Sequence, residues 1–255
     1  MELVIDTRNG IAGDIVCAGL IGLGADGKKV TSAMEYAGHE LGKTEVNLVV
    51  EQDIYQLGIR LEENIKHLHE SKAKVLLSDS MNHAGVSSKY GEIGNEILQT
   101  LCEAEKYVHQ NDPRLKEILK IHHHPHPNQK TEAILHEAKD IIIDITGFIV
   151  GIEELKISKT SFLDYVNVGR GQLTFSHGTM DVPAPSVKRI LETHNIPWQQ
   201  SDKYKKEMAT PTGTAILAGT NAERIESLDG SRILKSSQAR GTKKGMPPIK
   251  FTLLQ

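Results

Sequence analysis

Four histidines within a five-residue stretch form the densest group of metal ligands in the sequence. They are His122, His123, His124 and His126. Prolines at positions 125 and 127 keep this segment out of a helix, and neutral imidazole binds nickel, copper and zinc well. We therefore expect a loop that captures a divalent metal and hands it on. The alternative is a solvated polar loop with weak metal affinity. The residues alone support these two interpretations about equally.

A second group of ligand-forming residues follows this loop. Its members are His136, Glu137, Asp140 and Asp144. On a helix, positions 136, 140 and 144 would form one stripe, because each is four residues from the next. Imidazole and carboxylate groups in this arrangement could hold a divalent metal or a metal-bound phosphate. The competing interpretation is a solvated face with local His–Asp pairs, which is the commoner role of a charged stripe.

A glycine-containing loop near the N-terminus could bind a phosphate. Asp6 ends a short strand, and Gly10, Gly13 and Asp14 then open a helix. The free N–H groups and positive potential of a helix N-terminus favour an anion. Asp14 would alternatively stabilise the helix dipole. The spacing matches neither the dinucleotide-binding pattern nor the P-loop, so neither of those functions is supported.

A second loop with the same potential contains Thr210, Pro211, Thr212 and Gly213. Threonine as N-cap and proline at the first helical position are typical of a helix start. The backbone N–H groups of Thr212 and Gly213 could also bind a phosphate. His177 precedes a proline-rich segment, which either forms a simple turn or aims the imidazole into a cleft.

The elements that must position these groups are helices mixed with antiparallel strands. In chain order, the pattern predicts a strand, loop and helix over 1–24, an antiparallel strand pair over 46–62, a helix over 89–109, a helix over 131–155, strands over 157–182, a helix over 184–194, a helix from 210 and a last strand over 249–253. The β-branched run at 141–143 also fits a buried strand. Without a regular β-α-β alternation, we expect an α+β fold with a mixed, largely antiparallel sheet, packed helices and the histidine-rich loop. We expect one region over 1–255 with possible subdomains 1–155 and 156–255.

Composition excludes several classes of protein. The 255 residues carry 30 Lys+Arg against 33 Asp+Glu, a net charge of −3 that does not fit binding to nucleic acid through bulk positive charge. No apolar run approaches the ~18 residues of a membrane helix, and the first residues do not resemble a signal peptide. Cys17 and Cys102 fit buried thiols in a reducing compartment. We therefore expect a cytoplasmic protein.

Six segments follow one another as in a known family, from residue 3 to about residue 245. They are residues 6–14, 101–109, 136–145, 168–171, 176–185 and 210–217. The most specific are His-Gly-x-Met-x-Val-Pro-Ala-Pro and Thr-Pro-Thr-Gly-x-Ala-Ile-Leu. Together they resemble the LarC family of nickel insertion proteins, which acts in lactate racemase maturation.

The resemblance implies a nickel chelatase. Such a protein inserts nickel into a pyridinium bis-thiocarboxylate mononucleotide at the expense of CTP and so makes the nickel-pincer nucleotide. The resemblance implies that a histidine-rich stretch supplies the nickel. It also implies a separate C-terminal domain that binds CTP with a second divalent cation, magnesium or manganese.

From this resemblance we expect a division of labour among the candidate residues. The four loop histidines would collect nickel, and the second ligand group with His177 would pass it to a mononucleotide near the two phosphate-binding loops. The expected catalytic residues are Asp6, Asp14 and His177. The expected cofactor-binding residues are Gly10, Gly13, Thr210, Thr212 and Gly213.

Three departures from the family pattern keep alternatives open. The sequence ends with the family's N-terminal region, the segment after Glu137 is two residues shorter, and the first loop lacks two hydroxyls. One alternative is a nickel carrier or subunit whose partner chain supplies the CTP step. Another is a metal-dependent phosphate-ester hydrolase built on Asp6, Asp14, His136 and Asp144. The sequence leaves the oligomeric state open.

Overall fold

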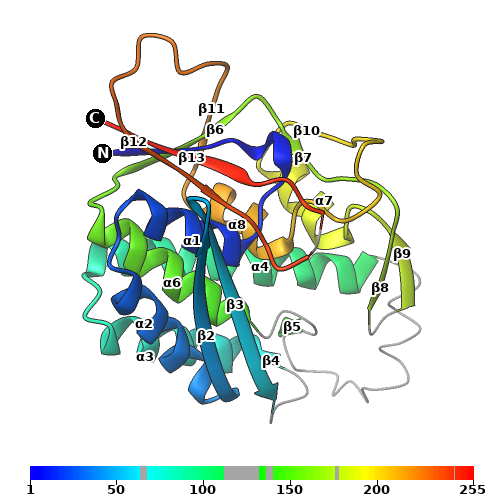
Figure 1. Cartoon of the computed structure of the whole chain (residues 1–255). Coiled ribbons are helices and arrows are strands. Elements are labelled where there is room, and N and C mark those ends of the chain that lie inside the picture. The colour runs from blue at the N-terminus through cyan, green and yellow to red at the C-terminus, as the bar shows by residue number, and fades with distance from the viewer. Residues whose placement is uncertain (64–67, 112–131, 136–139, 176–177, 244) are drawn as a thin grey trace.

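A computed structural model describes the chain except for residues 64–67, 112–131, 136–139, 176–177 and 244 (Figure 1). The helices are η1 Thr7–Asn9, α1 Gly13–Leu23, α2 Gly27–His39, α3 Glu70–His83, α4 Ser88–Asn111, α6 Ile141–Glu154, α7 Pro185–Thr193 and α8 Pro211–Gly219. The strands are β1 Glu2–Ile5, β2 Gly42–Glu51, β3 Ile54–Glu63, β4 Leu68–His69, β5 Ile134–Leu135, β6 Lys159–Leu163, β7 Val166–Asn167, β8 Gln172–Phe175, β9 Gly178–Asp181, β10 Trp198–Gln199, β11 Glu223–Ile225, β12 Ile233–Ala239 and β13 Ile249–Leu254. The histidine-rich loop lies outside the described residues.

A seven-stranded sheet runs in the order β11-β6-β1-β13-β12-β3-β2. Strand β1 lies inside it, parallel to β6 and antiparallel to β13. Its residues Leu3, Val4 and Ile5 are at most 2% exposed, which explains their uninterrupted apolar run. Parallel and antiparallel pairs alternate in blocks across the sheet. The expected α+β class with a mixed sheet is therefore confirmed.

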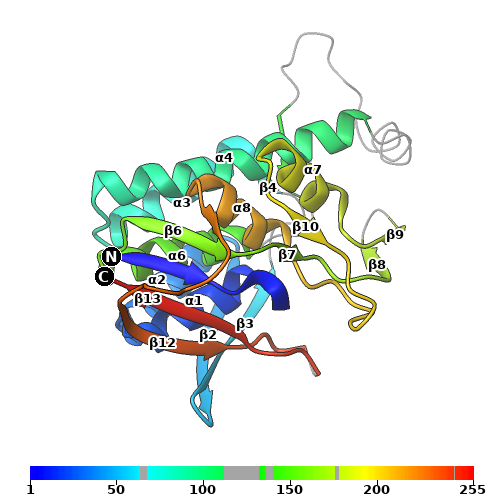
Figure 2. The ribbon, with the colours of Figure 1, turned by 90° about the horizontal axis from the view of Figure 1, so that it is seen from above.

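Helix α6 forms the centre of the helical layer. Every residue from Ile141 to Ile152 is buried, as expected for a helix that is apolar on all sides. It packs against α1, α2, α3 and α4, while α1 also contacts strands of the sheet. In Figure 2, β2 and α4 lie at opposite sides of the molecule, with α1 and α6 between them. None of the described helices is long and apolar enough to cross a membrane.

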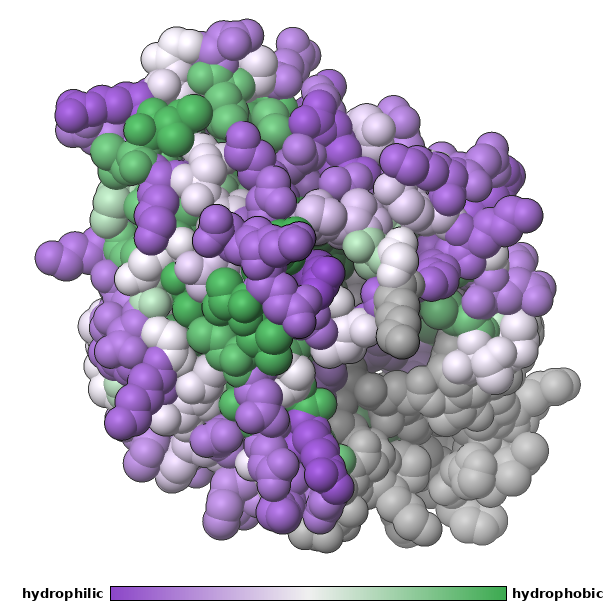
Figure 3. All heavy atoms as spheres, viewed as in Figure 1, coloured by the Kyte–Doolittle hydropathy of each residue, from purple (hydrophilic) through white to green (hydrophobic). Residues whose placement is uncertain are grey.

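The β2–β3 pair is the predicted antiparallel hairpin, extended to Gly42–Glu63. Its turn residues Gln52 and Asp53 have φ values of 51° and 61°, as a tight two-residue hairpin turn requires. Figure 3 shows hydrophobic side chains gathered over β2. Leu48, Val49 and Val50 on that strand are 37%, 45% and 49% exposed.

The prediction of one helix over 131–155 is wrong in its first part. The helix begins at Ile141, and the described residues before it include strand β5, which pairs with β4. Long-range contacts decide this. The backbone N–H of Glu70 donates to the carbonyl oxygen of Ala133 at 3.0 Å, and the Glu70 carboxylate accepts from the N–H of Ala133 at 3.3 Å. The run at 141–143 is helical, which settles the alternative that the sequence left open.

Candidate functional site

Four helices begin at the wall of one cavity of about 450 Å³. The cavity is lined by the first residues of each of these helices, which are Gly13 in α1, Ile141 in α6, Pro185 in α7 and Pro211 in α8. Glu105, Val108 and His109 from the last turns of α4 also line the cavity. The N-terminal ends of four helices, where the helix dipoles are positive, thus lie at one hollow. Such a hollow can stabilise negative charge in its lining or in a ligand.

Backbone hydrogen bonds hold the starts of α1 and α8 together. The N–H of Ile11 donates to the carbonyl of Met208 at 2.8 Å, and the N–H of Thr210 donates to the carbonyl of Ile11 at 2.9 Å. Gly10 has a φ of +93°, and any Cβ there would clash with the Met208 carbonyl. Gly213 packs against Ile11 in the same way. These two glycines therefore close the loops against each other and do not line the cavity.

The sequence prediction that Thr210 caps a helix is confirmed. Its hydroxyl oxygen accepts from the backbone N–H of Gly213 at 3.2 Å, and Pro211 occupies the first turn. Thr210 and Thr212 both line the cavity. Thr212 is 4% exposed, so its position at the wall is set by the buried start of α8.

Five carboxyl groups line this cavity. They are Asp14, Glu105, Asp140, Asp144 and Glu207. Asp144 is 4% exposed, and its Oδ1 has no hydrogen-bond partner among the described residues. Its Oδ2 occupies the space that the Cβ of any larger residue at position 13 would need. The glycine at the start of α1 is therefore required for Asp144 to reach the cavity, and the interpretation of Asp144 as part of a solvated face is wrong.

Burial raises the pKa of all five of these carboxyls. Desolvation raises the pKa of Asp14 to about 6 and that of Glu105 to about 7. It raises the pKa of Asp144 well above its usual value, and the nearby charges of Asp140 and Asp14 add to the effect. Desolvation also raises the pKa of Asp140, although the residue as a whole is exposed. Such a cluster is stabilised by an incoming cation.

Two nitrogen-bearing side chains face these acids. Lys243 Nζ lies 3.6 Å from Glu207 Oε2 and lowers the pKa of that carboxyl, although desolvation has the larger, opposite effect. His109 Nε2 lies 3.7 Å from Glu105 Oε2, one turn along α4. With five carboxyls and one lysine, the described lining is acidic at full ionisation.

The structure brings together only some of the residues that the sequence singled out. The predicted residues that line the cavity are Gly13, Asp14, Asp140, Asp144, Thr210 and Thr212. Asp6 does not line it, and its oxygens each accept from the Arg8 guanidinium at 2.8 Å. The candidates outside the described residues are His122, His123, His124, His126, His136, Glu137 and His177.

Within the described part of the chain, no three His, Cys, Asp or Glu side chains are close enough to hold a metal ion. The aspartates at the cavity thus do not form a complete coordination shell from the described residues alone.

Sequence reasoning missed four ionisable residues of the lining. They are Glu105, His109, Glu207 and Lys243. A signal did exist for two of them, because Glu105 and His109 belong to the 101–109 segment that carries the family resemblance. Glu207 and Lys243 come from loops with no such signal.

Comparisons with known proteins agree with this arrangement of motifs. The family described as "Nickel insertion protein" matches residues 3–249. A "Putative nickel insertion protein" of Methanothrix thermoacetophila is 30% identical over 230 residues, which cover 86% of this chain and 50% of the relative. A "Pyridinium-3,5-bisthiocarboxylic acid mononucleotide nickel insertion protein" of Thermotoga sp. is 30% identical over 225 residues (84% and 52%). One of the same name from Desulfitobacterium hafniense is 31% identical over 216 residues (84% and 48%).

The chain thus spans about half the length of these curated relatives. No solved structure matches it.

Proposed function

The chain belongs to the nickel insertion protein family, and from that premise we propose that it binds nickel and delivers it to a pyridinium mononucleotide bearing two thiocarboxylate groups. The substrate comes from the names of the relatives. The observation that carries the proposal is the cavity where four helix starts meet five carboxyls. It combines positive backbone potential with side chains that favour a cation.

In this proposal the aspartates form the nickel end of the cavity. Asp14, Asp140 and Asp144 offer hard oxygen ligands, whereas the thiocarboxylates of the substrate offer soft sulfur. Nickel accepts both kinds of ligand, and in this proposal the aspartates, which form no closed ligand set among the described residues, hold the metal less firmly than a chelating substrate does. Transfer from carboxylates to sulfur is then favourable.

The histidines complete the proposed route. His122, His123, His124 and His126 collect nickel, and His136, Glu137 and His177 guide it to the aspartates. The mononucleotide enters the cavity beside the starts of α1 and α8, where Gly13 and Thr212 line the wall. We place this chemistry in the cytoplasm. A step that consumes CTP with magnesium or manganese is assigned to a partner domain, as in the family resemblance.

Titration calorimetry with nickel at neutral pH tests the cavity. We expect Asp144→Asn to weaken nickel binding by tenfold or more, because it removes a carboxylate that no other described group neutralises. Asp6→Asn is the matched control, since Asp6 pairs with Arg8 away from the cavity, and it should change nickel affinity less than twofold. Equal affinities for wild type and Asp144→Asn would refute the assignment. Replacing the four loop histidines by alanine tests, in the same assay, whether the loop collects nickel. Unchanged nickel affinity and stoichiometry would contradict that role.

The proposed insertion step has its own assay. The full chain is incubated with nickel, CTP and the dithio-mononucleotide, and mass spectrometry follows nickel in the nucleotide. If nickel enters the nucleotide and pyrophosphate is released, the chain is an enzyme by itself. If nickel binds to the chain but never enters the nucleotide, it is a carrier that needs a partner for the CTP step. A hydrolase built around Asp6 is disfavoured, because Asp6 lies outside the cavity that holds Asp14 and Asp144.

A further inference from the structure

A second cavity of about 390 Å³ adjoins the first. Val108 of α4 and Pro185 of α7 line both cavities, so the two are neighbours across these residues. The second cavity lies between the end of α4, strand β9 and α7, and Lys188 and Arg189 of α7 contribute to its wall. The proposed function involves only the first cavity.

The two cavities differ in charge. The first has five carboxyls against one lysine, whereas the second has Lys188 and Arg189 against Asp181 and Glu192. Both acids of the second cavity already have partners. Asp181 Oδ1 accepts from the side-chain amide of Gln172 at 3.4 Å, and Glu192 Oε1 lies 3.7 Å from Lys188 Nζ. A group with two negative charges is therefore repelled less by the second cavity than by the first.

Arg189 is held in a defined orientation. Its guanidinium carbon lies 3.7 Å from the centre of the Tyr107 ring, and both residues line the second cavity. Stacking on an aromatic ring leaves the in-plane N–H donors of a guanidinium available, and that planar fork matches two oxygens of a phosphate. Lys188, one residue away, is a flexible point charge, which a bound phosphate would share with Glu192. This combination suits a terminal phosphate monoester.

We propose that the phosphate of the mononucleotide binds in the second cavity, to Arg189 and Lys188, while its ring lies in the first. This inference rests on the proposed function. Ser186 lines the first cavity, and Arg189 lines the second. Three residues of helix rise about 4.5 Å, which is the scale of the ribose that joins ring and phosphate. Helix α7 thus contributes to both proposed parts of the site, through Ser186 and Arg189.

Calorimetry with two probes tests the assignment. The probes are pyridinium-3,5-dicarboxylic acid mononucleotide, the oxygen analogue of the substrate named by the relatives, and its riboside, which lacks only the phosphate. We expect wild type to bind the mononucleotide at least tenfold more tightly than the riboside. Arg189→Gln and Lys188→Met should each reduce that ratio at least threefold without changing riboside affinity or nickel affinity.

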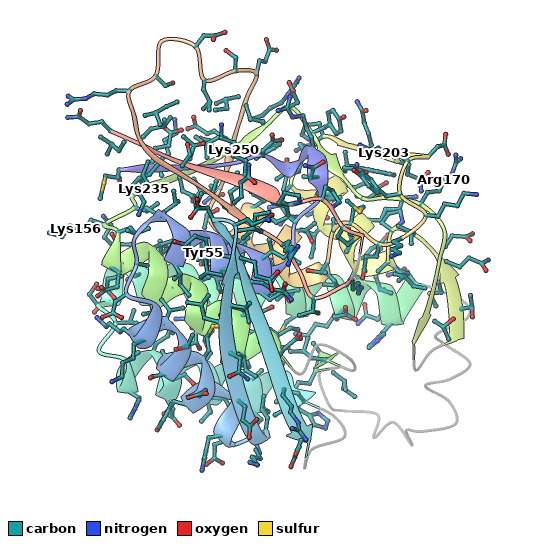
Figure 4. The ribbon with its side chains drawn as sticks, in the orientation of Figure 1. Tyr55, Lys156, Arg170, Lys203, Lys235 and Lys250 are labelled. Atoms are coloured by element: carbon teal, nitrogen blue, oxygen red, sulfur yellow. The ribbon has the colours of Figure 1, made fainter. Side chains whose placement is uncertain are left out.

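Lys203→Met is the matched control, because it removes one positive charge from a residue that lines neither cavity. Figure 4 shows Lys203 near Arg170 at the edge of the molecule. This variant should keep the wild-type ratio. Lys188 has a side chain that is 54% exposed, so Lys188→Met reports on the site even if Arg189→Gln unfolds.

The outcomes separate the two proposals. If wild type binds both probes equally, or if Lys203→Met lowers the ratio as much as the α7 variants, the phosphate assignment is overturned while the nickel function stands. If wild type binds neither probe, with or without nickel, the nucleotide part of the proposed function fails and the assignment fails with it. A lower ratio confined to Arg189→Gln and Lys188→Met supports the assignment.

Discussion

Two parts of the first cavity hold carboxyl groups in different surroundings: the floor, formed by Asp144, and the rim, formed by Glu207 and Lys243. At the floor, Asp144 lies on the wholly buried helix α6 and has an oxygen without a described partner. At the rim, Glu207 pairs with Lys243, whose side chain is 63% exposed. Water and salt screen a rim pair, whereas a buried charge keeps its full penalty until a ligand compensates it. The comparison indicates that the floor determines whether a cation binds, and the rim adjusts how strongly.

The largest expected effect is a loss of stability with rising pH in the metal-free protein. Asp14 and Glu105 have folded-state pKa values raised to about 6 and about 7. Below the unfolded-state pKa values near ~4 these carboxyls are protonated in both states and do not lower the stability of the fold. As pH rises through the folded-state values the buried groups ionise, and this stability is lost. Each pKa unit corresponds to about 1.4 kcal/mol, so the free energy of unfolding should fall by roughly 3 kcal/mol per group between pH 4 and pH 8.

Urea unfolding across this pH range provides the measurement. Saturating nickel should flatten the decline, because the metal stabilises the ionised carboxylates. If the free energy of unfolding of the metal-free protein is constant from pH 4 to pH 8, burial does not raise the pKa values of Asp14 and Glu105.

A smaller effect is expected when the floor is overfilled. Gly13→Ala places a methyl group against the Asp144 carboxyl and should lower the free energy of unfolding by about 1–3 kcal/mol, as overpacking does, with weaker nickel binding. Gly91→Ala is the control, because the nearest atom to its Cβ would be 3.9 Å away. In helix α4 this control should be neutral or stabilising by up to about 1 kcal/mol. If both alanine variants unfold like wild type, the close approach of Gly13 and Asp144 is not required.

The smallest effect is expected at the rim. Lys243→Met should change the free energy of unfolding by less than about 1 kcal/mol. Removing its charge should strengthen nickel binding two- to threefold at low ionic strength, and high salt should abolish the difference. Lys235→Met on β12 (Figure 4) is the matched control, since it does not line the cavity. If Lys243→Met instead weakens nickel binding tenfold, the rim contributes more than the comparison allows.

Local patterns predicted the elements that carry a clear periodicity. The apolar run of β1, the hairpin turn at Asp53 and the cap at Thr210 all occur where expected. Helices α2 and α3 were not predicted, although their buried positions follow helical spacing, at 30, 33, 34 and 37 in α2 and at 73, 76, 77, 80 and 81 in α3. The start of α6 was misplaced because the contacts of Glu70 with Ala133 join segments far apart in sequence.

The candidate site was predicted in the same uneven way. Spacing identified Asp140 and Asp144, but it placed them on a helical stripe that ran through His136, and the described helix begins only at Ile141. That Asp144 is buried follows from the packing of α1 on α6, which no local pattern contains. Glu207 and Lys243 reach the cavity through loops from distant parts of the chain, so only the folded structure reveals their role.

The central position of α6 has a consequence for the exchange of backbone hydrogens. A helix buried on every side opens only when the molecule unfolds as a whole, so its amide hydrogens should exchange as slowly as global unfolding allows. The floor of the cavity therefore belongs to the most slowly opening part of the protein. Nickel binding should therefore slow amide exchange in α6 only as far as it stabilises the entire fold.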